Sequence, residues 1–196
     1  HFQTESSRVD QLIAFHSIGR HCDAWGIKAL EIDSAMLAGG KFRILTLEAF
    51  MPDGTALKWN GKLESSSLEI NLEDLSDDVK NSETIDIYIG LPLGTRKNKE
   101  GNFRFEEKVS DPVVDDFQDG EPIDIPRLTY NLKIFVNERP PGSYSSFKLC
   151  VLKNVDGVIK VGDYIPPLID IGVSKFLTEE LKNCLLYTSD AADDGL

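Results

Sequence analysis

The chain has 196 residues, 41% of them hydrophobic, so it is long enough to enclose one substantial core, and a second domain has to be small. Its 33 acidic residues outnumber 21 basic ones, and the formal net charge of -12 opposes binding to nucleic acid or to an anionic membrane surface. No signal-peptide pattern and no run of about 18 apolar residues occurs, so we expect no membrane insertion.

The first periodic segment predicts a short amphipathic helix between Ser6 and Ile18. Val9, Leu12 and Ile13 fall on one face of that helix, and Gly19 supplies a stop signal. The sequence begins at His1 without a Met, so we expect the chain to be a fragment whose true N-terminus is missing.

After this helix the apolar residues follow the two-residue period of β-strands. Pro52, Asp53 and Gly54 predict a tight turn, and the Asp-Gly pair at 156–157 predicts a two-residue hairpin. The segment from 95 to 126 is rich in charged residues and Gly, so we expect an exposed excursion in which only Phe103 and Phe105 suggest a strand. The segments that carry strand patterns are 27–33, 42–50, 55–59, 68–72, 85–93, 128–136, 147–153 and 159–161.

The chain ends with a second helix pattern, in which Ser174 is a candidate cap. Phe176, Leu177 and Leu181 form its apolar stripe together with Cys184. Many short strands with one apolar face each predict a mainly β fold, an antiparallel β-sandwich with helices only at its ends. We expect the sandwich to span residues 1–171, a helical segment 172–186, and a non-native or disordered tail 187–196.

The three cysteines, Cys22, Cys150 and Cys184, are odd in number and far apart, which is neither a disulfide framework nor a zinc pattern. A reducing cytoplasm is the compartment that fits this usage. His16 and His21 lie on different faces of a helix end and a loop, so we expect no metal site from them and Cys22.

Sequence patterns for cofactor binding and catalysis are largely missing. No Gly-rich loop ends in Gly-Lys-Ser/Thr, and no Gly-x-Ser-x-Gly elbow occurs. Asp115 and Asp119 have calcium-loop spacing, but Phe117 and Pro126 occupy positions that need oxygen ligands, which leaves only an irregular ion site open. We therefore expect no cofactor and a structural rather than an enzymatic role.

Seven segments follow one another in a recognisable order and spacing: His1-Phe2-Gln3, Trp25-Gly26-Ile27, Leu30-Glu31-Ile32-Asp33, Leu37-Ala38 with Gly40-Lys41-Phe42, Pro52-Asp53-Gly54-Thr55, Ile89-Gly90-Leu91-Pro92-Leu93 and Tyr164-Ile165-Pro166-Pro167. Taken together, they resemble the TssK (ImpJ or VasE) family of type VI secretion baseplate proteins. The resemblance covers roughly residues 1 to 185, with the acidic excursion unmatched.

This resemblance implies a shoulder domain like that of phage receptor-binding proteins, followed by the start of a helical neck. It further implies a homotrimer attached to a wedge of TssF and TssG, near the inner membrane. A head domain absent from this chain would contact the membrane complex proteins TssL and TssM. We expect wedge contacts near Phe2 and Gln3, and trimer contacts on Phe176, Leu177 and Leu181.

Two other readings of a β-sandwich stay open at this point. A carbohydrate- or protein-binding module of adhesin type predicts exposed, coplanar Trp25 and Trp59 beside a groove. A jelly-roll enzyme predicts two carboxylates that face each other across a cleft, one of them with a shifted pKa. Core or interface packing is the ordinary role for both tryptophans.

Overall fold

The computed structural model of the chain describes residues 8–9, 12–13, 25–61, 67–75, 82–94, 96–108, 127–155, 158–174 and 176–184. Of the expected N-terminal helix, residues 8–9 and 12–13 are helical, and the remainder lies outside the described residues.

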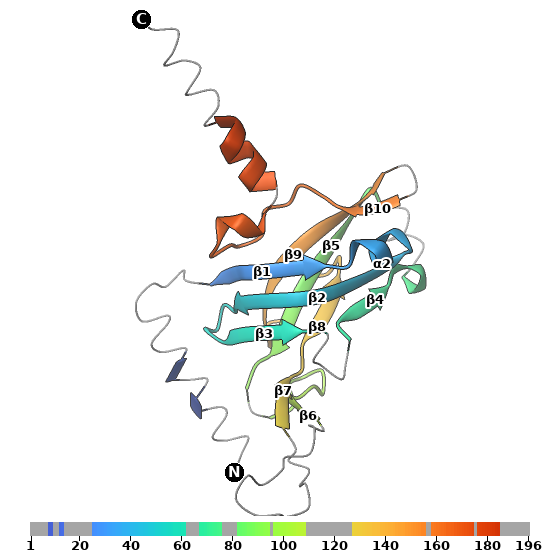
Figure 1. Cartoon of the computed structure of the whole chain (residues 1–196). Helices are drawn as coiled ribbons and strands as arrows, with labels where there is room; N and C mark the ends of the chain where they lie inside the picture. The colour runs from blue at the N-terminus through green and yellow to red at the C-terminus, as the bar shows by residue number, and fades with distance from the viewer. Residues whose placement is uncertain are drawn as a thin grey trace, which may run out of the picture.

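Two four-stranded sheets and a small ribbon form the fold, and all strand pairs within them are antiparallel (Figure 1). The first sheet has the order β1 (Gly26–Ile32), β2 (Lys41–Phe50) and β3 (Ala56–Asn60), with β4 (Glu69–Asn71) paired to the beginning of β2. The second has the order β10 (Val158–Val161), β9 (Tyr144–Val155), β5 (Thr84–Pro92) and β8 (Lys133–Val136). The ribbon joins β6 (Phe105–Lys108) and β7 (Arg127–Tyr130).

The two sheets pack face to face, with β1, β2 and β3 crossing the direction of β5 and β9 (Figure 1). Each sheet gives one apolar face to a shared core, as the alternation in the sequence predicts. The antiparallel β-sandwich is therefore confirmed. Fully buried members of the core include Ile27, Phe42, Ile44, Leu47, Ile87, Ile89, Leu91, Leu149 and Leu152.

β-Bulges keep the long strands on this core. In β2, Ile44 pairs with Ile32 but Thr46 pairs with Glu31, so Leu45 is an extra residue, and the buried positions change from even to odd numbers. In β9 the extra residue is Leu149, which shifts the buried positions in the opposite sense. Without these bulges, one half of each strand would turn its apolar side chains toward solvent.

Three expectations about the elements are wrong. Helices are not confined to the ends of the chain, because the short helix α2 (Ser34–Ala38) connects β1 to β2. The Asp33 carboxylate caps α2 by accepting a hydrogen bond from the Met36 amide at 3.0 Å. The segment 68–72 forms only the three-residue β4, because the 3-10 helix η1 (Leu72–Asp74) begins at Leu72. The predicted strand 85–93 ends one residue early, because β5 stops at Pro92 and Leu93 is 37% exposed.

The predicted strand 128–136 is also wrong as a single element, because it divides between the ribbon and the second sheet. At the break, the Asn131 amide donates to the Arg104 carbonyl, and the Asn131 side chain donates to the Phe103 carbonyl, both at 2.9 Å. These bonds hold the chain at the ribbon, and Leu132 then begins a new path toward β8. The hairpin between β9 and β10 is confirmed, since Val155 pairs with Val158.

Candidate docking surfaces

Residues 176–184 are helical, and Ser174 is the cap that the sequence predicts. The Ser174 hydroxyl accepts a hydrogen bond from the Leu177 amide at 3.2 Å, which satisfies one of the free amides at the helix start. Phe176 is 40% and Leu181 44% exposed, and Leu177 is half-buried. Phe2 and Gln3 lie outside the described residues.

The path into this helix is attached to β1. Leu168 forms a parallel bridge with Ile27, whose amide donates to the Pro167 carbonyl at 2.8 Å and whose carbonyl accepts from the Ile169 amide at 2.9 Å. Gly26 makes this approach possible: its φ is +143°, and a Cβ there would lie 2.8 Å from the Pro167 carbonyl carbon. The Trp-Gly and Tyr-x-Pro-Pro segments of the sequence therefore form one contact.

The same path crosses the outer face of the second sheet. The Lys148 ammonium lies 2.8 Å from the Asp86 carboxylate and 4.7 Å from the centre of the Tyr164 ring. Burial raises the pKa of the Tyr164 hydroxyl, with the Lys148 charge opposing the shift. Under this face, burial raises the pKa of Cys150 to about 12, so its thiol is protonated and unreactive at neutral pH.

Exposed apolar side chains cluster along this exit path, outside the sandwich core. Exposed apolar side chains along one path make this surface a candidate contact site for another polypeptide. Figure 1 shows the helix leaving the sandwich beside β1. We call this set the exit strip; it consists of Ile165, Ile169, Ile171, Phe176 and Leu181.

Arg104 is a buried arginine that hydrogen-bonds to residues far away in sequence, and the sequence did not predict it. It is 8% exposed, although it lies in the segment expected to be an exposed excursion. Its guanidinium donates to the Pro92 carbonyl at 2.9 Å, to the Asp53 carboxylate at 3.0 Å, and to the Thr55 hydroxyl. It thereby ties the turn between β2 and β3 to the end of β5. No local pattern singles out this arginine, because its partners are far away in sequence.

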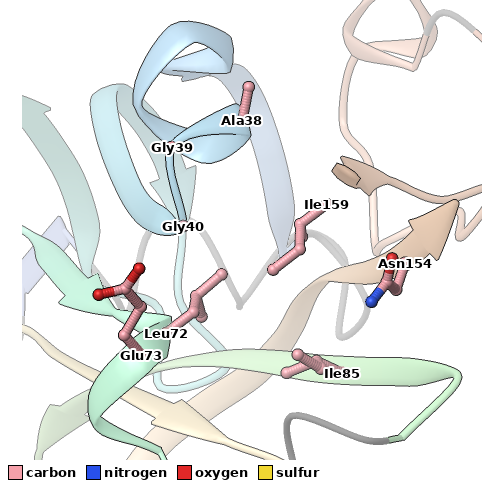
Figure 2. A pocket seen from close by; sticks show the side chains of 8 residues that line it. All are labelled: Ala38, Gly39, Gly40, Leu72, Glu73, Ile85, Asn154 and Ile159. Carbon is pink, nitrogen blue, oxygen red and sulfur yellow. The ribbon is translucent and has the colours of Figure 1, made fainter. Parts of the chain in front are cut away.

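A pocket of about 640 Å³ opens at the other end of the sandwich, between α2 and the hairpin of β9 and β10 (Figure 2). Its floor is apolar: Leu72 and Ile85 are buried, and Leu72 faces Ile159 across the pocket. Glu73 is the charged residue of its lining, and its carboxylate lies against Gly40, where an added Cβ would be 3.7 Å from Oε1. Ala38, Gly39 and Asn154 complete the wall.

The positions of the tryptophans and carboxylates give little support to the adhesin-type binding module or to the jelly-roll enzyme. Trp59 is 3% exposed, and Trp25 packs against Phe147 at 6.1 Å between ring centres, so they form no exposed sugar-stacking platform. The lowered pKa of the Glu48 carboxylate comes from its hydrogen bonds and charge interactions with Lys58 and Lys28 on neighbouring strands. That is a surface ion-pair cluster and not a catalytic dyad.

The described residues contain neither a metal-binding cluster nor a membrane-spanning helix. The described acidic, histidine and cysteine side chains do not gather in any group of three or more fit to hold a metal ion. No helix in the described part of the chain combines the length and the apolar character that a membrane span requires.

Several solved structures share this fold. A chain of a TssK-TssF-TssG baseplate subcomplex matches with a TM-score of 0.76 and 20% identity, over 96% of this chain and 64% of that one. A crystal structure of TssK matches with a TM-score of 0.72 and 16% identity, over 94% of this chain and 42% of that one. These likenesses are to the fold alone.

The sequence comparisons identify the family. The type VI secretion system baseplate component TssK1 of Pseudomonas aeruginosa is 27% identical over 201 residues, which cover 94% of this chain but only 43% of that relative. The chain therefore spans less than half the length of this curated relative. The family described as "Bacterial Type VI secretion, VC_A0110, EvfL, ImpJ, VasE" matches residues 1–189, and the chain belongs to this family.

Proposed function

We propose that this chain is the shoulder part of a cytoplasmic baseplate adaptor of type VI secretion, a structural protein that holds other subunits in place. The observation that carries the proposal is the match of residues 1–189 to the family of bacterial type VI secretion proteins, supported by the likeness to the TssK1 baseplate component. The proposed partners are a wedge of TssF and TssG. A head domain outside this chain would link the assembly to TssL and TssM near the inner membrane.

The proposed homotrimer uses the exit strip and the helix 176–184 as its contact between copies. Phe176 and Leu181 are exposed apolar residues on a helix that leaves the sandwich, and three such helices would cover one another's apolar faces. Leu177, half-buried against its own chain, would set the angle of the helix. Phe2 and Gln3 remain the proposed wedge contacts at the other end of the sequence.

Two measurements test this function together. Native mass spectrometry of the protein should give a trimer, and the double variant Phe176→Asp, Leu181→Asp should shift it to smaller species. Lys182→Asp, an exposed change on the same helix, is the matched control and should leave the trimer intact. Co-purification with TssF and TssG tests the wedge contact, which Phe2→Asp should weaken. A parent protein that binds neither itself nor the wedge would overturn the proposal.

A further inference from the structure

The pocket of Figure 2 has apolar surface that the described residues leave partly open: Ile159 is half-buried, above the buried Leu72 and Ile85. Leu72 begins η1, directly after β4 of the first sheet, while Ile85 and Ile159 come from β5 and β10 of the second, so the pocket lies at one end of the space between the layers. Met36 and Val158, which are 37% and 39% exposed, lie on the two elements that flank it, α2 and β10. An occupant with an aliphatic portion would remove this apolar surface from water.

The charge of the pocket indicates the other half of that occupant. The exposed Glu73 has no ion-pair partner among the described residues, and Asp74 follows it in η1. The residues that end α2 form the wall next to Glu73, and the last turn of the helix contains no basic residue. The Glu73 carboxylate favours a cation at the pocket rim. The net charge of -12 further disfavours an acidic occupant.

From these two features we infer that the pocket receives a lysine or arginine side chain of a wedge subunit. The aliphatic stem would lie on Leu72, Ile85 and Ile159, and the cationic head would pair with Glu73 beside the α2 end. Lysine and arginine are the side chains that combine an apolar stem with a charged tip. This inference rests on the proposed function, because it specifies one contact with the wedge.

The test compares binding of the full-length protein and its variants to purified TssF–TssG over a range of salt concentrations. Glu73→Gln keeps the shape but removes the charge, and it should weaken binding about fivefold at low salt, the upper end for a surface ion pair. The loss should shrink as salt is added. Ala38→Phe places a large side chain at the pocket rim and should weaken binding about tenfold, as displacement of a central interface side chain does.

Matched controls carry the same chemical changes elsewhere on the surface. Glu107→Gln lies on the exposed face of β6 and Ala56→Phe on the edge strand β3, and neither residue lines the pocket. Both should bind as the parent does, and urea unfolding of all four variants checks that they are folded. A photo-crosslinker at position 38 should attach to a wedge peptide that contains lysine or arginine.

The outcomes separate this inference from the proposed function. If the parent binds the wedge but Glu73→Gln and Ala38→Phe bind equally well, the inference is wrong and the function stands. If the parent does not bind the wedge, the proposed function itself fails. A crosslink from position 38 to a second copy of this chain would also overturn the inference, because the occupant would then be the homotrimer partner.

Discussion

Replacing Arg104 by methionine should destabilise the sandwich more than any other single arginine change in the described part of the chain. The substitution removes the hydrogen bonds to the Pro92 carbonyl, the Asp53 carboxylate and the Thr55 hydroxyl. Hydrogen bonds to a charged group contribute roughly 1.5–3 kcal/mol each when buried. The Asp53 side chain is 23% exposed and retains its bond from the Thr55 amide, so water offsets part of the loss.

We therefore expect Arg104→Met to lower the free energy of unfolding by about 3 kcal/mol, or the melting temperature by about 6–12 °C for a chain of this size. Urea unfolding followed by Trp59 fluorescence measures it. Arg139→Met is the control, because Arg139 is exposed, and it should change stability by less than about 0.5 kcal/mol. A double-mutant cycle with Asp53→Asn should give a coupling of about 1–3 kcal/mol. Equal effects of Arg104→Met and Arg139→Met would refute the reasoning.

Three further predictions concern the exit path and the core. Gly26→Ala should cost about 1–3 kcal/mol and speed hydrogen exchange at the Ile169 amide, because its Cβ would collide with Pro167 at a positive φ; Gly142→Ala, with open space around it, should be neutral. Ser174→Ala should remove about 1 kcal/mol from the helix 176–184 and speed amide exchange there, whereas unchanged exchange would contradict the cap. Because the folded pKa of Cys150 is raised from 9.0 to about 12, the unfolded thiol loses its proton first as pH rises. The free energy of unfolding should fall by up to about 1.4 kcal/mol per pH unit between those values, and Cys150→Val should lack that part of the slope.

Local chemistry in the sequence determined most of the strands. The alternation of Ile85, Ile87 and Ile89 needs only a sheet with one buried face, and an Asp-Gly pair needs only a two-residue turn, so both predictions hold without knowledge of the rest of the chain. The same is true of the Ser174 cap, which acts within four residues. The limits of the three domains stay a prediction.

Only the tertiary structure decided where a regular pattern is interrupted. The alternation from Leu128 to Val136 continues through Asn131, yet the strand breaks there because partners in the 103–104 segment bind it. Arg104 shows the same dependence, since a charged residue in an acidic segment reads as exposed until Asp53 and Pro92 are brought to it.

Of the candidate docking surfaces, the sequence predicts the helix stripe but not the pocket. The helix stripe of Phe176, Leu177 and Leu181 is readable from a 3.6-residue period, because all its members belong to one element. The pocket at Glu73 is assembled from α2, η1, β5, β9 and β10, so no window of sequence contains it. Periodicity reports which face of an element is apolar, whereas a cavity forms only where the faces of several elements fail to meet.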